Sequence, residues 1–238
     1  MIHPRVVRRM ELEREDRGDR VIVGIDQSFS NYAMVKFVNG VPTDRAMFHT
    51  GDSSAKKNAE KTYGMYFESP ALQLNYLSEL VIEKLVEWNP NDIAMEGLAF
   101  GSNSAVERQL GALLWGIQVL IHRELNYPYD NLHTVTPLQV KALAREFMRG
   151  NDKYAKESTG ELIRLKSGKL KLNPMKDKRE VLTALENTKH SWIVDGYVRD
   201  GLVAARKTET GLHDLPDAYF IGLFVLEERF GHKEERPE

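Results

Sequence analysis

The chain of 238 residues contains no cysteine, so disulfide bonds and thiolate metal sites are excluded. It has no run of roughly eighteen apolar residues that would cross a membrane, and no basic segment followed by an apolar one that would mark a signal peptide. Paired histidine motifs of the kind that bind zinc are also absent. We therefore expect a protein without membrane contact that works in the cytoplasm.

The sequence also lacks a strong overall charge, because 33 basic and 35 acidic residues leave a net charge of −2. Such a balance looks unsuited to binding a polyanion until the charge is read locally. Residues 162–179 hold seven basic side chains and one acid. The basic side chains are Arg164, Lys166, Lys169, Lys171, Lys176, Lys178 and Arg179. This segment is a basic region on an otherwise balanced protein.

The hydrophobic fraction of 42% is enough for one large core. Residues 1–19 form a charged lead of mixed sign, which we interpret as an N-terminal extension. We expect residues 20–238 to form a single domain, with a basic insertion at about residues 150–177.

Four carboxylates lie at the ends of apolar segments. Asp26 ends residues 21–26, Glu96 ends a second apolar run, and Asp214 and Asp217 open a third. The last two acids are spaced i, i+3, so they share one helix face near the N-terminus, where the macrodipole favours negative charge. Each acid alone is explained by the preference of Asp for strand ends and helix caps, but the set predicts convergence on one point.

Carboxylates that converge in this way raise one another's pKa and destabilise the fold unless cations neutralise them. Hard oxygen ligands suit Mg²⁺, with Mn²⁺ as a substitute, better than zinc. We expect Asp26 to bridge two ions about 4 Å apart, with the other three acids completing their shells. The chemistry that this arrangement predicts is hydrolysis of a phosphodiester by an activated water, without a protein nucleophile.

The order of the predicted elements indicates the fold. Three strand patterns come first, at residues 21–26, 32–38 and 43–49, and Asn39-Gly40 is a hairpin signal between the last two. Helical and strand patterns then alternate at residues 70–88, 92–96, 104–123, 132–135 and 138–148. This order predicts an α/β ribonuclease-H-like fold, a mixed sheet of three antiparallel strands followed by parallel strands and flanked by helices.

Four segments resemble, in the same order, the motifs of the RuvC family of Holliday-junction resolvases. They are Gly24-Ile-Asp26-Gln-Ser, Glu96-Gly-Leu-Ala-Phe-Gly-Ser-Asn103, Thr136-Pro-Leu-Gln-Val-Lys141 and Asp214-Leu-Pro-Asp217-Ala218. No single motif is specific to this family, but the four motifs in this order are considerably more specific. After the first aspartate the family usually has Pro-Gly, whereas this chain has Gln27-Ser28. That departure suits a diverged member, such as one encoded by a phage.

The resemblance implies roles for individual residues. It assigns metal binding and catalysis to Asp26, Glu96, Asp214 and Asp217. It places near the DNA the side chains of Lys141, Lys178, Asn103 and Phe100, the last beside the position where bacterial members stack an aromatic ring at the junction. It also implies a homodimer, because a four-way junction needs two symmetric cuts, and products with 5′-phosphate and 3′-hydroxyl ends.

The insertion is longer than the corresponding loop of that family. Apolar and basic residues alternate around Ser167-Gly168, which predicts a hairpin with one cationic face. Its DNA-facing residues would be Arg164, Lys166, Lys169 and Lys171. A solvated surface hairpin explains the charge equally well, but beside an acidic metal site the pattern favours contact with phosphates.

Three other functions remain open at this point. The same fold and metals could act on a flap, a fork or an RNA/DNA hybrid. A phosphotransferase of the actin and sugar-kinase type also begins with a strand ending in Gly-Ile-Asp, although its Gly-rich phosphate loop has only poor counterparts here. A non-catalytic scaffold for branched DNA is the third, and it has no need of four acids.

Overall fold

The computed structural model describes residues 18–50, 67–98, 105–175, 177–194 and 214–237. Most of the predicted N-terminal extension lies outside these residues, so the expected domain division stays a prediction. The strands are β1 (Val21–Asp26), β2 (Asn31–Val38), β3 (Val41–His49), β4 (Asp92–Glu96) and β5 (Leu132–Val135). The α-helices are α2 (Pro70–Trp88), α3 (Ala105–Leu125), α4 (Pro137–Glu146), α5 (Lys178–Glu186) and α7 (Asp214–Phe230), and the 3₁₀ turns are η1 (Tyr129–Asn131) and η2 (Gly150–Lys153).

The five strands form one mixed sheet in the order β3-β2-β1-β4-β5. β1 pairs antiparallel with β2 and parallel with β4. β3 extends the antiparallel side, and β5 extends the parallel side. This is a ribonuclease-H-like fold. The fold class predicted from the element order is therefore confirmed.

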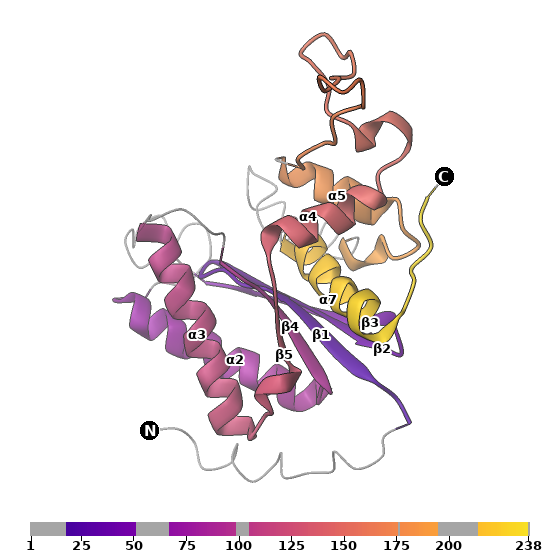
Figure 1. Ribbon diagram of the computed structural model, residues 1–238. Helices are drawn as coiled ribbons and strands as arrows, with labels where there is room; N and C mark the ends of the chain where they lie inside the picture. The colour runs from indigo at the N-terminus through magenta and orange to yellow at the C-terminus, as the bar shows by residue number, and fades with distance from the viewer. Residues whose placement is uncertain (1–17, 51–66, 99–104, 176, 195–213, 238) are drawn as a thin grey trace.

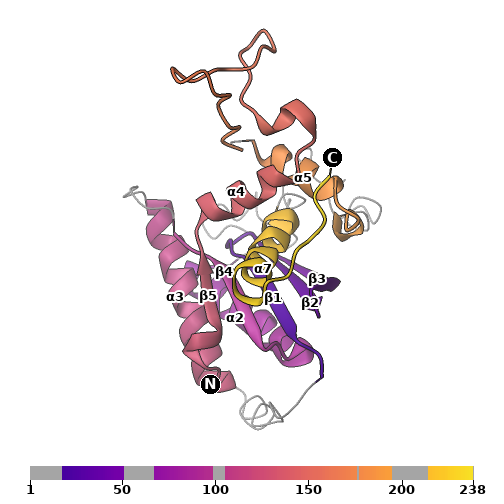
Figure 2. The ribbon, with the colours of Figure 1, turned by 45° about the vertical axis from the view of Figure 1, so that its right-hand side comes forward.

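Helices cover both faces of the sheet (Figure 1). Alternate residues of β1 point to opposite faces, so Ile22 joins a core with α4, α5 and α7 while Val23 joins a core with α2 and α3. All six residues of β1 are buried, because this central strand is covered on both sides. Figure 2 shows α7 lying along the sheet near β1.

Most predicted elements are observed within two residues of their expected ends. The Asn39-Gly40 hairpin is present, and both residues have the positive φ, 52° and 84°, that a tight hairpin turn requires. α4 ends two residues early because Phe147 leaves the helical conformation. Its ring, fully buried, packs against Phe220 with centroids 5.4 Å apart.

The predicted hairpin around Ser167-Gly168 is present, with an antiparallel bridge between Arg164 and Leu170. It belongs to a larger projection, residues 153–173, which we call the arm. The arm leaves the body between α4 and α5 and extends away from the sheet (Figure 1).

The C-terminal residues after α7 are fastened to the body. Arg236 donates to Glu227 at 2.7 Å and to Glu146 at 2.9 Å, and its guanidinium carbon lies 4.2 Å from the centroid of the Phe147 ring. This clasp ties the tail to both α7 and α4. Within the described ranges, no helix is long and apolar enough to cross a membrane.

A close backbone contact between α7 and the sheet involves two glycines. A Cβ on Gly24 would lie 2.1 Å from the carbonyl oxygen of Ala218 and 2.6 Å from the amide nitrogen of Gly222. A Cβ on Gly222 would lie 2.4 Å from the ring of Phe37. Only glycine at these positions allows the helix backbone to rest on the strand backbone.

We expect Gly24→Ala to destabilise the protein by about 3 kcal/mol, which lowers the melting temperature by roughly 6–12 °C, because the methyl group meets backbone atoms that cannot turn aside. Thermal unfolding followed by circular dichroism measures the change. Gly18→Ala is the matched control, since no atom of a non-adjacent described residue lies within 4 Å of its Cβ position. Equal melting temperatures for the two variants would contradict the role given to this contact.

Candidate active site

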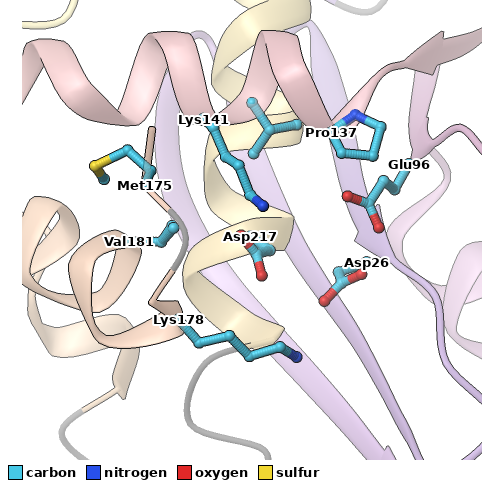
Figure 3. A pocket seen from close by; sticks show the side chains of 9 residues that line it. Asp26, Glu96, Pro137, Lys141, Met175, Lys178, Val181 and Asp217 are labelled. Atoms are coloured by element: carbon cyan, nitrogen blue, oxygen red, sulfur yellow. The ribbon is translucent and has the colours of Figure 1, made fainter. Parts of the chain in front are cut away.

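Asp26 and Glu96 end two neighbouring parallel strands. The register pairs Ile25 of β1 with Met95 of β4, so the next residue on each strand is one of the acids. Because the carboxyl ends of parallel strands meet at one edge of a sheet, the two side chains emerge side by side. Their carboxyl groups are close enough for the negative charge of Glu96 to raise the pKa of Asp26. In Figure 3 both point into one pocket.

α7 brings the other two acids to the same edge. Its first turn carries Asp214 and Asp217, whose spacing places them on one face of the helix. The contact of Gly222 with Gly24 fixes the helix against β1, the strand that ends in Asp26. Three separate elements thus deliver four carboxylates to one region.

A pocket of about 150 Å³ lies between the sheet edge and the helices. Its polar lining consists of Asp26, Glu96, Asp217, Lys141 and Lys178. Its apolar lining consists of Pro137, Val140, Met175 and Val181. Asp214 lies beside this pocket rather than in its wall. The structure therefore brings together the four acids and the two lysines that the motifs single out.

Lys141 is the fifth residue of α4, and Lys178 is the first residue of α5 (Figure 3). Each helix begins with a capping box, made by Thr136 and Gln139 in α4 and by Asp177 and Glu180 in α5. The caps fix where each helix starts, and so they fix where each lysine enters the pocket. The side chain of Lys178 is mostly exposed, but its Nζ lies 3.2 Å from the Oδ1 of Asp214.

Burial and mutual repulsion shift the acids toward their neutral forms. Burial raises the pKa of Asp26 well above its usual range, and the negative charges of Glu96 and Asp217 add to the shift. Burial, with the charge of Glu96, raises the pKa of Asp217 to about 7, while Lys178 opposes the shift. The pKa of Glu96 is also raised by burial, against the attraction of Lys141 and Lys178.

The pKa of Lys178 is raised although its ammonium, at the end of a mostly exposed side chain, is partly shielded from water. Burial acts to lower it, but the charges of Asp214, Asp26 and Asp217 outweigh burial, and the pKa is raised. The lysine therefore stays charged and partly neutralises the acids. A cationic side chain thus occupies part of the electrostatic role that a metal would fill.

The donor chemistry fits a hard divalent cation, because the acidic side chains are carboxylates and the described residues of the pocket wall include no histidine. Among the residues that the structure describes, no three His, Asp or Glu side chains stand close enough to hold a metal ion as they are placed. The ammonium of Lys178 pairs with one carboxylate oxygen of Asp214. Metal binding would require the carboxylates to close around the ion.

Gln27 is a site residue that the sequence reasoning treated only as a departure from the family motif. Its side chain is buried, and its Nε2 donates to the backbone oxygen of Glu96 at 2.8 Å. Its Oε1 is buried without a hydrogen-bond partner in the described part of the chain. Gln27 therefore ties the end of β1 to the end of β4. Its place directly after the first acid was the available signal.

The remaining candidates lie elsewhere. Arg164, Lys166, Lys169 and Lys171 are on the arm and are exposed, outside the pocket wall. Phe100 and Asn103 fall outside the described residues. Their proposed contacts with DNA stay predictions.

No family model and no curated protein matches this chain. Among solved structures, the RuvC of Thermus thermophilus in complex with a Holliday junction substrate is 16% identical with a TM-score of 0.48, over 90% of this chain and 98% of that one. A second structure of Thermus thermophilus RuvC has the same identity and coverage with a TM-score of 0.47. A ROK hexokinase from Thermus thermophilus is 12% identical with a TM-score of 0.31, over 84% and 88% of the two chains. At these values the likeness assigns neither substrate nor activity to this chain.

The raised pKa of Asp217 makes the stability of the metal-free protein depend on pH. A carboxyl whose pKa is higher in the folded state stabilises the fold while it is protonated, and this contribution is lost as the pH rises through the folded value of about 7. Between about pH 5.5 and pH 8 we expect a loss on the order of 2 kcal/mol, or several degrees in melting temperature.

Calorimetry in EDTA measures this loss, and Mg²⁺ should restore more stability at pH 8 than at pH 5.5. Asp217→Asn should flatten the dependence, because its amide does not titrate. A wild-type melting temperature that rises over this interval would show the sign to be wrong.

Proposed function

We propose that this chain is a RuvC-type endonuclease that requires Mg²⁺, accepts Mn²⁺, and cuts branched DNA, specifically four-way junctions. The observation that carries the proposal is the meeting of four carboxylates from β1, β4 and α7 with two lysines around one pocket. A cluster of this kind costs folding free energy, so a function that needs the acids explains it better than a structural role.

The donor set would hold divalent ions through Asp26, Glu96, Asp214 and Asp217. When bound, such ions supply Lewis acidity at a phosphate and a water of lowered pKa. Gln27 holds the strand ends that carry the first two acids. The ammonium groups of Lys141 and Lys178 lie at the pocket, where they would attract and orient a phosphodiester. We expect products with 5′-phosphate and 3′-hydroxyl ends, as the resemblance to the RuvC family implies.

The test offers the protein a labelled four-way junction, a flap, a linear duplex and an RNA/DNA hybrid, each with Mg²⁺ or EDTA. We expect paired, symmetric nicks in the junction that need the metal. Asp26→Asn should lower the rate on the order of a thousandfold, because it removes a charged ligand from the centre of the cluster. Asp130→Asn, an exposed position at the opposite end of the sheet, is the matched control.

The other outcomes discriminate between functions. Metal-dependent cleavage of the flap or the hybrid alone would keep the nuclease and overturn the junction as its substrate. Junction binding without any cleavage would favour a scaffold. Full activity of Asp26→Asn would overturn the assignment of the pocket.

A homodimer follows from the proposed substrate, since two symmetric cuts are made most simply by two symmetric sites. α3 carries two exposed apolar side chains four residues apart on one face, Trp115 with 61% and Val119 with 52% of its surface exposed. Apolar exposure of this size suits a contact with a second copy.

We expect Trp115→Glu to give a monomer by light scattering and to convert paired nicks into single, uncoupled ones. The reason is that a charge on this face opposes burial against a second copy. Val41→Glu, at another exposed apolar side chain, is the control and should stay dimeric. A wild-type protein that is monomeric both free and bound to the junction would contradict the proposal.

A further inference from the structure

The arm is built from an eight-residue repeat. The units are residues 153–160 (KYAKESTG), 161–168 (ELIRLKSG) and a shorter third unit that ends with the arm, residues 169–173 (KLKLN). The second position is Tyr154, Leu162 or Leu170, and all three side chains are half-buried. The last position of the first two units is glycine. The units share few residue types, but equivalent backbone positions make equivalent hydrogen bonds.

Hydrogen bonds join the third residues of the units in a closed ring. Ala155 donates its backbone N–H to the carbonyl of Lys171 at 2.8 Å, Lys171 donates to Ile163 at 2.8 Å, and Ile163 donates to Ala155 at 2.9 Å. The bridges keep the same period, with Lys156 opposite Leu162 and Arg164 opposite Leu170. Three short segments thus surround a pseudo-threefold axis, and each is paired with the other two.

The turns repeat as well. Gly160 donates to the carbonyl of Glu157 at 2.9 Å, and Gly168 donates to that of Leu165 at 2.8 Å. Both glycines have positive φ, 88° and 80°. The guanidinium of Arg164 closes the second turn by donating to the Gly168 carbonyl at 2.9 Å. The arm is therefore an ordered unit with a defined tip.

The base of the arm is fixed to the walls of the pocket. Asn173 donates from its side chain to Glu180 of α5 at 2.7 Å, and its carbonyl accepts from Arg145 of α4. Two residues further on, Met175 is fully buried and lines the pocket itself. The arm therefore has a set direction relative to the four acids, rather than swinging on a free linker.

The surface of the arm combines cations with exposed apolar groups. Residues 153–173 contain six basic side chains and two acidic ones. The basic ones are Lys153, Lys156, Arg164, Lys166, Lys169 and Lys171. Leu165 opens the second turn between Arg164 and Lys166, and 48% of its surface is exposed. Cations alone would suit any phosphate backbone, but an exposed leucine among them suits a partner that offers both phosphates and an accessible apolar face.

We propose that the arm recognises the branch of a DNA junction, with Lys166, Lys169 and Lys171 on the phosphates and Leu165 against the base pair that the branch leaves unstacked. This inference rests on the proposed function, because it names what selects the substrate of the same pocket. Unstacked base faces occur at a branch and not within a continuous duplex, so Leu165 would supply selectivity while the lysines supply affinity.

Binding assays separate this inference from the nuclease assignment, since they run with Ca²⁺ or EDTA and need no cleavage. Fluorescence anisotropy compares a four-way junction with a linear duplex over a range of salt concentrations. Replacing Lys166, Lys169 and Lys171 together by Gln should weaken binding to both DNAs by about 10- to 100-fold near 0.1 M salt. It should also reduce the salt slope by about 2 to 3.

Leu165→Ser should lower the preference for the junction over the duplex by roughly 5- to 20-fold and leave the salt slope unchanged. Leu72→Ser on α2, with 51% of its surface exposed, is the matched control and should bind like the parent. Should the triple variant fold poorly, Lys166→Gln alone should reduce the salt slope by about 1.

Junction binding by Leu165→Ser with unchanged preference would overturn the role of the leucine, and an unchanged salt slope in the lysine variants would overturn the role of the arm. Either result leaves the nuclease proposal intact. Conversely, a protein that never nicks DNA but shows these binding changes would retain the arm proposal and lose the nuclease.

Discussion

The contact between Gly24 and Gly222 is the constraint on which the rest of the structure depends. It lets α7 lie directly on β1, backbone against backbone, at a distance that any side chain would prevent. Asp214 and Asp217 open α7, so its position decides how near they come to Asp26. α4 and α5, which carry the two pocket lysines, pack against α7 in their turn.

In the pocket, burial and cation binding favour different protonation states of the acids. Burial favours neutral carboxyls, while binding a cation requires them to be charged. Lys141 and Lys178 moderate this conflict, because their positive charges lower the pKa values that burial raises. The side chain of Lys178 is mostly exposed, so its ammonium can move without disturbing the core. The buried carboxyls lower the stability of the fold, but they place several charges close together at one pocket.

Much of the fold could be predicted because local and global signals agree. The β-branched run before Asp26, the Asn39-Gly40 turn and the caps of α4 each specify one conformation from a few neighbouring residues. The convergence of the acids could also be inferred, because parallel strands share an edge and a helix has a period. These inferences needed only the order of the elements.

Other features could not be found in that way. Gln27 acts through a hydrogen bond to the backbone of Glu96, 69 residues away, which no local pattern encodes. The arm was interpreted as one hairpin because only its second turn carries the alternating basic pattern. Its threefold closure depends on carbonyl and amide partners in units that share little beyond an apolar position and a turn. Repeats this short are held by backbone geometry more than by side-chain identity.

The two ends of the arm meet. The amide of Asn173 donates to the carbonyl of Lys153 at 3.0 Å, so the chain leaves the body and returns to it at nearly one point. An element with this topology can be gained, lost or exchanged without rerouting any strand of the sheet. The body that holds the pocket and the arm are therefore separable in evolutionary descent, and a related body could carry a different projection at the same two helix ends while keeping its pocket.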